Sequence, residues 1–272
     1  RLSWRKEVLV TRGSEHLVAT NNSVSIIGID CATQSNKVGL ALGSVSNGIL
    51  SIEKARKVAK NESVANVVSN WIKEQGNVKT LIALDSPLGW PVKLGEELIG
   101  HMAGALLSTD AHQMFRRRTD FFIKEKAGKQ SLDVGADRIA RTAHAALMLI
   151  DELTDQLGTT IPLAWSAELV DPISAIEVYP AVTLKSCQLL PATSYKKEIS
   201  KERSWIFDGL SQLMNVSEMD KELVIADDDI LDAVVCVLAG YHFIRAESEG
   251  PRTKQERALA EKEGWIWARM PR

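Results

Sequence analysis

Apolar runs divide the first third of the chain into predicted strands. Residues 24–30 (VSIIGID) and 80–85 (TLIALD) are apolar stretches that end in an aspartate, a pattern typical of strands buried on both faces. Residues 38–45 and 49–58 predict two more strands, which the turn Ser46-Asn47-Gly48 joins into a hairpin. The chain is therefore expected to open as a three-stranded meander, followed by a separate fourth strand.

Apolar residues at helical spacing predict a helix over residues 61–75, between the meander and the fourth strand. A strand, a helix and a parallel strand form the right-handed unit of an α/β sheet, whose ligands bind at the carboxyl ends of the strands. A fifth strand is expected at residues 174–179 (SAIEVY), with Glu177 as its polar member. Further helices are predicted at residues 134–157, from Pro180 onward, and at residues 196–214, 227–246 and 255–263.

Together these elements predict an α/β fold in which helices flank a mixed five-stranded sheet. Residues 24–272 are expected to form a single domain, with a mainly helical insertion at residues 92–171 after the fourth strand. Residues 1–23 are expected to be a polar lead-in to this domain. Residues 264–267 (GWIW) are either a last strand or a packing anchor.

Four aspartates stand where such a fold would bring them together. Asp30 and Asp85 end two buried strands, while Asp229 and Asp232 lie one helical turn apart at the start of a late apolar helix. Acids in a first helical turn cap free amides and complement the helix dipole, which accounts for the acids just before Asp229. Capping accounts poorly for Asp232, because an ionised carboxylate among apolar neighbours is costly unless it is paired, hydrogen-bonded or bound to metal.

Several carboxylates in one cleft repel one another unless cations lie between them. Mg²⁺ takes oxygen ligands and keeps water and substrate phosphate in its remaining positions. Two such ions about 3.5–4 Å apart can activate water and stabilise the leaving oxygen in phosphodiester cleavage. An aspartate that ends a strand is also common as a turn or helix cap, so the order of the acids along the chain is more specific than any one of them.

This order of acids resembles that of the ribonuclease H-like superfamily. GIDCA at residues 28–32 looks like the first-strand motif of its resolvase branch, and ALDSP at 83–87 takes the place of the fourth-strand acid. DILDA at 229–233 looks like the D-x-x-D-A motif of its last helix. From residue 24 onward the chain also resembles an uncharacterised prokaryotic family of predicted ribonuclease H-like nucleases, the domain of unknown function 429 family. The motifs that carry this second resemblance are LDSPLGWP, FRRRTD, GADRIARTA, IEVYPA, DDDILDA and EGWIW.

The resemblance implies a ribonuclease H-like sheet and a nuclease that hydrolyses phosphodiester bonds of DNA or RNA with two Mg²⁺ or Mn²⁺ ions. The metal ligands that it implies are Asp30, Asp85, Asp229 and Asp232, with Asp30 bridging both ions. Glu177 is a further catalytic candidate, which either supplies a carboxylate to the site or pairs with an arginine. The family often has a histidine where this chain has Asp228, which is either a cap or an extra ligand.

Arginines supply the local positive charge that a substrate phosphate would need, because a guanidinium binds phosphate through paired hydrogen bonds. The candidates for phosphate binding are Arg116, Arg117, Arg118, Arg138 and Arg141. Some of them are equally suited to solvated turns or to ion pairs with acids such as Asp120. The basic residues between Lys196 and Arg203 are interleaved with glutamates, which favours a solvated helix face.

Composition narrows the choice of partners and compartment. The net charge of -2 excludes a global basic field for gripping nucleic acid, so any such site must be local and helped by cations. The three cysteines are scattered, without zinc-type spacing, which favours a reducing cytoplasm, and Cys31 is expected to fill a small buried apolar position. No apolar run approaches the roughly 20 residues of a membrane span. No long apolar core follows Arg1, Arg5 and Lys6, so no signal peptide is expected.

Two other functions are compatible with these patterns. One is a nucleic-acid-binding or assembly module that keeps the fold without catalysis, and the complete set of acids argues against it. The other is a nucleotide-binding phosphotransferase of the actin-like ATPase type. That class needs a duplicated fold and glycine-rich phosphate loops, for which the sequence shows no pattern, so the metal-dependent nuclease is the favoured hypothesis.

Overall fold

The computed structural model describes residues 23–135, 137–196, 200–216 and 218–271, so the predicted lead-in lies outside the described residues except for Ser23. Five strands form one sheet in the order β3-β2-β1-β4-β5. β1 pairs antiparallel with β2 and parallel with β4, which confirms the predicted mixed five-stranded sheet. The strands are β1 (Val24–Asp30), β2 (Gly39–Ser46), β3 (Ile49–Lys57), β4 (Lys79–Asp85) and β5 (Ile173–Glu177).

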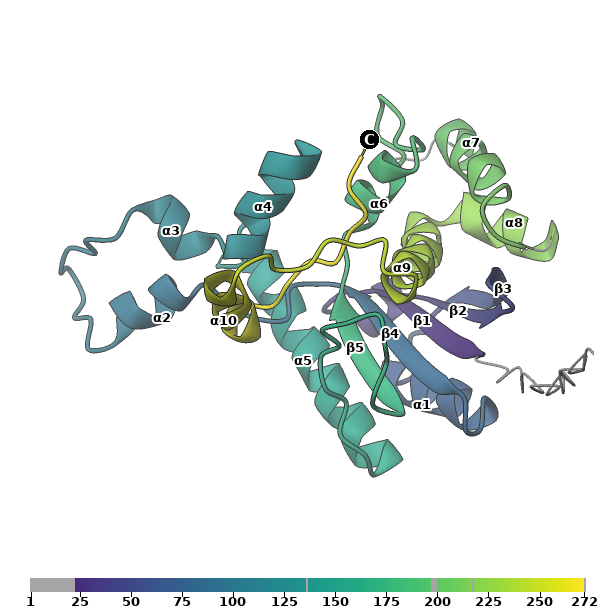
Figure 1. The fold of residues 1–272 in the computed structure, drawn as a ribbon, viewed down its shortest axis with the longest axis horizontal. Helices are drawn as coiled ribbons and strands as arrows, with labels where there is room; N and C mark the ends of the chain where they lie inside the picture. Colours follow the sequence, from purple (N-terminus) through teal and green to yellow (C-terminus); the bar gives the residue numbers. More distant parts are fainter. Residues whose placement is uncertain (1–22, 136, 197–199, 217, 272) are drawn as a thin grey trace, which may run out of the picture.

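Helices cover both faces of this sheet (Figure 1). Helix α9 (Asp228–Ile244) packs on one face, and helices α1 (Val64–Glu74) and α5 (Asp137–Leu157) pack on the other. Adjacent strand residues point to opposite faces, so Ile26 joins the core under α9 while Ile27 joins the core shared with α1 and α5. Both faces are therefore apolar, as the continuous apolar runs of β1 and β4 predict.

Two glycines let α9 approach the sheet closely. A Cβ atom at Gly28 would lie 2.0 Å from the carbonyl oxygen of Ala233, and one at Gly39 would lie 1.9 Å from that of Asp229. Only a residue without a side chain allows this contact between a strand and the backbone of the helix. The first turns of α9 consequently rest directly on the ends of β1 and β2.

The segment between β4 and β5 is mainly helical. It contains α2 (Val92–Leu98), α3 (Ala111–Phe115), α4 (Arg118–Ala127) and α5, and α2 and α3 extend away from the sheet (Figure 1). The remaining helices are α6 (Pro180–Ser186), α7 (Ser200–Leu210), α8 (Glu218–Ala226) and α10 (Lys254–Glu263). None of the helices in the described ranges is long and apolar enough to cross a membrane.

After α10 the chain returns to the edge of the sheet. The backbone N–H of Trp267 donates to the carbonyl oxygen of Glu177 at 2.9 Å, a single bridge rather than a strand. Trp265 and Trp267 are 2% and 7% exposed, so residues 264–267 are a packing anchor. Burial also removes both tryptophans as surfaces on which a base could stack.

Candidate metal centre

Three aspartates converge at the carboxyl ends of the parallel strands. Asp30 and Asp85 are direct neighbours in the register of β1 and β4. Asp232 comes from the second turn of α9, which the glycine contacts described above hold against β1. One carboxylate oxygen from each of these residues lies within 4.8 Å of the other two. The structure therefore brings together three of the four predicted ligands, from segments up to 202 residues apart in sequence.

Asp229 belongs to a different group of acids. Asp227 is the N-cap of α9 and accepts hydrogen bonds from the backbone N–H groups of Asp229 and Ile230. Lys57 bridges this cap, with its ammonium 2.8 Å from Asp227 and 2.5 Å from Asp229. The expectation that Asp229 joins Asp30 at the same point is not met in this structure, because Lys57 already holds its carboxylate. Asp228 lies in the same first turn, 3.9 Å from Arg203, and its carboxylate lies close to those of Asp227 and Asp229.

Two residues that the sequence did not single out contact Asp232. The hydroxyl of Tyr195 donates to Oδ1 of Asp232 at 2.8 Å, and the ammonium of Lys196 pairs with Oδ2. The solvated helix face expected from Lys196 to Arg203 is wrong at Arg203, which is 6% exposed and donates to backbone carbonyls of Ile225 and Tyr195. Lys196 is exposed as expected, with 46% of its side chain accessible, yet its ammonium is held by Asp232. The alternation of basic and acidic residues predicted a solvent-exposed helix face, but Arg203 is buried because its guanidinium contacts the backbone of a segment about 20 residues later.

Burial and mutual repulsion make ionisation of the three carboxyls unfavourable. Burial, followed by the neighbouring charges of Asp85 and Asp232, raises the pKa of Asp30 to about 9. Burial and the charge of Asp232 raise the pKa of Asp85 to about 8. Burial also raises the pKa of Asp232, while Lys196 and Tyr195 oppose that shift. One ammonium thus compensates only part of the negative charge that three ionised aspartates would carry.

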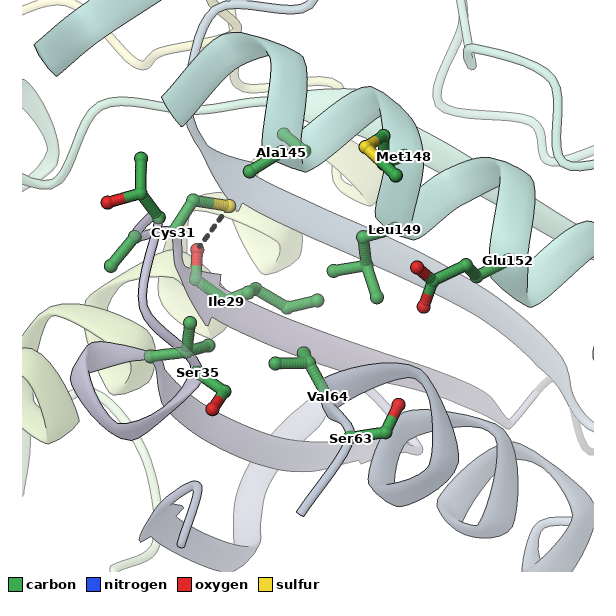
Figure 2. A pocket seen from close by; sticks show the side chains of 13 residues that line it. Ile29, Cys31, Ser35, Ser63, Val64, Ala145, Met148, Leu149 and Glu152 are labelled. Carbon is green, nitrogen blue, oxygen red and sulfur yellow. Dashed lines mark hydrogen bonds between the residues drawn. The ribbon is translucent and has the colours of Figure 1, made fainter. Parts of the chain in front are cut away.

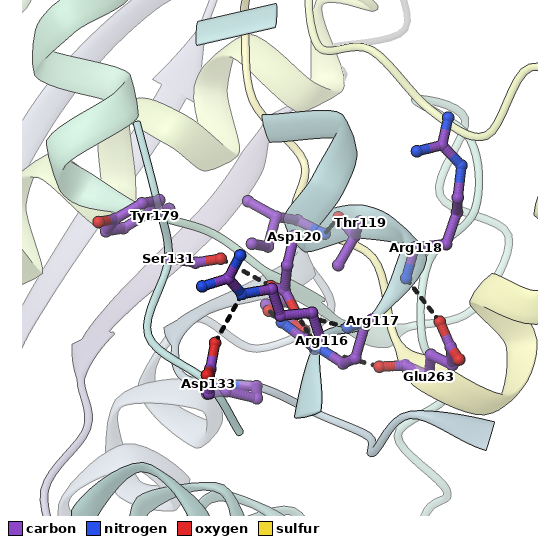
Figure 3. Close-up of polar contacts among 12 residues, drawn as sticks. Arg116, Arg117, Arg118, Thr119, Asp120, Ser131, Asp133, Tyr179 and Glu263 are labelled. Carbon is purple, nitrogen blue, oxygen red and sulfur yellow. Dashed lines mark hydrogen bonds and ion pairs between the residues drawn. The ribbon is translucent and has the colours of Figure 1, made fainter. Parts of the chain in front are cut away.

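Glu177, Arg117 and Asp120 form a buried ion network beside this group, and Figure 3 labels Arg117 and Asp120. All five N–H donors of Arg117 are used, in bonds to the carboxylates of Asp120 and Glu177 and to the carbonyl of Glu263. Arg117 is 1% exposed, so the hypothesis that it binds phosphate is wrong. Glu177 takes the arginine-pairing alternative and also accepts the backbone N–H of Leu88 at 3.1 Å.

Ion pairs also hold the arginines on either side of Arg117. Arg116 lies 2.8 Å from Asp133 and Arg118 lies 2.7 Å from Glu256 (the first pair is drawn in Figure 3). Arg138 and Arg141 are exposed on α5, and Arg141 is 3.8 Å from Asp137. The arginine-rich turn is therefore largely internal, and α5 carries the more accessible guanidinium groups of this set.

Two cavities meet at Cys31. One, of about 220 Å³, lies beside Asp30 and Asp85 and includes Leu132 and Ile139 in its wall. The other, of about 280 Å³, lies under α5 and includes Met148 and Leu149 in its wall (Figure 2). Burial, followed by the charges of Asp30 and Asp85, raises the pKa of the Cys31 thiol well above its usual value. A thiolate nucleophile is therefore unfavourable here, although Cys31 is half-buried rather than fully buried as expected.

A comparison with protein-family models shows to which family the chain belongs. A family model described as a protein of unknown function (DUF429) matches residues 28–254. The chain belongs to the DUF429 family. In this DUF429 protein the match spans all three converging aspartates and both residues that contact Asp232. A search among curated proteins found no match.

The donor set of this DUF429 site fits a hard divalent cation. The three aspartates offer only carboxylate oxygens, the ligand type that Mg²⁺ and Mn²⁺ prefer. Their spacing allows oxygen atoms from all three to face one ion. The three aspartates also carry more negative charge, when ionised, than the ammonium of Lys196 compensates, which favours a cation at this position.

Proposed function

We propose that this protein is a Mg²⁺- or Mn²⁺-dependent nuclease that hydrolyses phosphodiester bonds of nucleic acid. The observation that supports the proposal is the convergence of Asp30, Asp85 and Asp232, within 4.8 Å, at the carboxyl ends of parallel strands. This group has three acids facing one described ammonium, an excess of negative charge that a divalent cation would offset. The order of the acids along the chain also resembles that of ribonuclease H-like nucleases.

Asp30, Asp85 and Asp232 would hold the cation. When bound, such an ion lowers the pKa of water and stabilises negative charge on phosphate oxygens. Tyr195 fixes the orientation of Asp232 by its hydrogen bond to Oδ1. Hydrolysis breaks one P–O bond, with hydroxide from water joining phosphorus and a proton joining the leaving oxygen.

Asp229 would serve a second ion only if its carboxylate leaves Lys57. Asp229 and Asp232 are on one face of α9, and the charge of Asp229 still contributes to raising the pKa of Asp30. A two-metal route is therefore compatible with this helix, and Lys57 is the residue that would have to change partners.

The test is cleavage of labelled single-stranded, duplex, hybrid and branched DNA and RNA with Mg²⁺ or Mn²⁺. We expect Asp30→Asn, Asp85→Asn and Asp232→Asn to lower cleavage by more than about 100-fold, since outer-shell changes alone cost about 10–100-fold. Isothermal calorimetry of the same variants should show loss of Mn²⁺ binding.

Asp227→Asn is the matched control. It removes a charge from the neighbouring acid group, and asparagine keeps the capping interaction, so folding and cleavage should persist. Cutting that survives Asp30→Asn would indicate a contaminating enzyme. Nucleic acid that binds equally well with and without Mg²⁺ and is never cut would favour the non-catalytic binding module instead.

A further inference from the structure

The cavity of about 220 Å³ opens directly beside the carboxylates of Asp30 and Asp85. Its other walls come from residues 131 and 132, from residues 139 and 142 of α5, from the loop after β4, from Arg117, from the end of β5 and from the segment after α10. The apolar side chains among them are Leu132, Ile139 and Ile266, together with the ring of Tyr179. One end of the cavity is thus acidic, and its remaining wall combines these apolar and aromatic side chains with Arg117, Glu177 and the hydroxyl groups of Ser86, Ser131 and Thr142.

Leu132 shows that folding leaves part of this wall uncovered. Its side chain is 68% exposed, while Ile266 at the back of the cavity is 3% exposed. Tyr179 is half-buried, and its hydroxyl makes only a long bond of 3.4 Å to the carbonyl of Gln130. An accessible leucine and tyrosine beside Asp30 and Asp85 suit a ligand with a flat apolar part, whose anionic part would meet the cation that these aspartates would hold.

The size of the cavity limits this ligand to one ring system. Pockets for drug-sized molecules measure about 300–1,000 Å³, so a volume of about 220 Å³ is small for such a ligand and far too small for a base pair with its backbone. Enzymes that take a single nucleotide out of the stack hold its base in a snug pocket between aromatic and apolar side chains.

The distribution of positive charge also favours a ligand that is bound mainly through its base. Arg116, Arg117 and Arg118 each pair with an acid, and the net charge of the chain is -2. A protein that makes few phosphate contacts gains little affinity from counterion release. Contacts with the base must therefore contribute a larger share of the binding free energy.

We infer that this cavity receives the base of one unstacked nucleotide while its phosphate lies at the metal centre, an inference that rests on the proposed function. A base inside a duplex is not available to such a pocket. The preferred substrate class is consequently a single strand, or a duplex with an extrahelical nucleotide at the cleaved step. The cavity in Figure 2 lacks Asp30 and Asp85 in its wall and is not needed for this role.

The first experiment measures binding without cleavage. The Kd values of nucleoside 5′-monophosphates and of ribose 5-phosphate are compared by calorimetry in the presence of Mg²⁺. We expect the nucleotides to bind at least about fivefold more tightly, because stacking of one base contributes about 1–3 kcal/mol. Equal affinity for ribose 5-phosphate would overturn the inference.

Variants on α5 locate the base. Ile139→Trp fills the cavity and removes the space for the base. The Kd for ribose 5-phosphate should then exceed that for the nucleotides by less than about twofold, because the stacking contact is lost. Leu147→Trp is the matched control, since Leu147 is 37% exposed on the same helix and lies in neither cavity wall. Leu132→Ala, at an exposed position, should weaken nucleotide binding without loss of folding. A nucleotide advantage that survives Ile139→Trp would exclude this cavity.

A second arm separates this inference from the nuclease proposal. An oligonucleotide with an abasic residue at the cleaved step should be cut at least tenfold more slowly than the intact strand. Base-dependent nucleotide binding without cleavage of any strand would sustain the pocket and reject the nuclease. Equal cleavage of the abasic and intact strands would reject the pocket and sustain the nuclease.

Discussion

Single glycines decide whether the aspartates meet. Gly28 and Gly39 have no side chain, so the backbone of α9 reaches β1 and β2 at the turns that carry Asp229 and Asp232. The approach of Asp232 to Asp30 therefore depends on Gly28, a residue that contributes no side chain to the site. In the motif GIDCA, Gly28 allows the close approach of α9 and Asp30 supplies a carboxylate to the proposed metal centre.

We predict that Gly28→Ala weakens both folding and metal binding. Its methyl group would overlap the carbonyl of Ala233 at 2.0 Å, so α9 must move and take Asp232 with it. The free energy of unfolding should fall by about 1–3 kcal/mol, the usual cost of overpacking. Mn²⁺ affinity measured by calorimetry should fall at least tenfold.

Gly95→Ala is the control for this substitution. Gly95 lies in α2, and a Cβ atom there meets nothing within 4 Å. Alanine should leave metal affinity unchanged and stabilise the helix by up to about 1 kcal/mol in urea denaturation. Unchanged Mn²⁺ affinity in folded Gly28→Ala would show that the close contact does not position Asp232.

The sequence allowed Asp30, Asp85 and Asp232 to be predicted because local pattern places each of them. A buried strand ends at a known residue, parallel neighbours align their ends, and helical spacing fixes the face of Asp232. Tyr195 and Lys196 contact that face from 36–37 residues away, and no local period encodes such a contact. Their segment contains glutamates as well as lysines, which is also the composition of a solvated surface.

At the scale of elements, one buried ion network joins four segments. Arg117 precedes α4, Glu177 ends β5, and Leu88 and Glu263 bring in the loop after β4 and the end of α10. Each segment carries one of the motifs LDSPLGWP, FRRRTD, IEVYPA and EGWIW. These motifs thus share a structural role beside the proposed metal centre, which explains why Arg117 and Glu177 looked functional in sequence.

Loss of Arg117 should be costly for this network. Arg117→Met leaves the carboxylates of Asp120 and Glu177 buried without their partner, so the free energy of unfolding should fall by about 3–5 kcal/mol. Arg117→Lys should not rescue it, because an ammonium cannot replace the paired bonds of a guanidinium.

Arg141→Met is the comparison for urea or thermal denaturation. The side chain of Arg141 is 78% exposed, and removal of an exposed charge usually changes stability by less than about 0.5 kcal/mol. If the two substitutions shift the unfolding midpoint equally, the buried network does not contribute more to stability than an exposed ion pair.

At the scale of the whole molecule, buried ionisable groups link folding to pH. His242 on α9 is 4% exposed, and within the described part of the chain its Nδ1 has no hydrogen-bond partner. Burial, followed by the charge of Arg269, lowers the pKa of His242 from 6.5 to about 4. The unfolded chain therefore takes up this proton first, and the stability contributed by neutral His242 is lost as pH falls from about 6.5 to about 4.

We predict a difference in pH dependence between the wild type and His242→Gln. Between pH 7 and pH 5 the wild type should lose about 2 kcal/mol more of its free energy of unfolding, since each pKa unit corresponds to about 1.4 kcal/mol. Glutamine keeps a polar side chain without titration, so the comparison isolates this group from the acids near the metal centre. Parallel pH profiles in urea denaturation would show that His242 titrates normally in the folded protein.

The path of the segment after α10 sets an order of events during synthesis. Strands β1 to β5 are complete once residue 177 has been made, yet the carbonyl of Glu263 reaches Arg117 and the N–H of Trp267 reaches Glu177 only about 90 residues later. At a translation rate of about 5–20 residues per second, the nascent sheet waits several seconds for these partners. Residues 162–164 already bridge Ala175, but the end of the β5 edge at Glu177 lacks its partner during that interval. The emerging chain is therefore most open to wrong pairing or to a chaperone at this point just before its last helix is made.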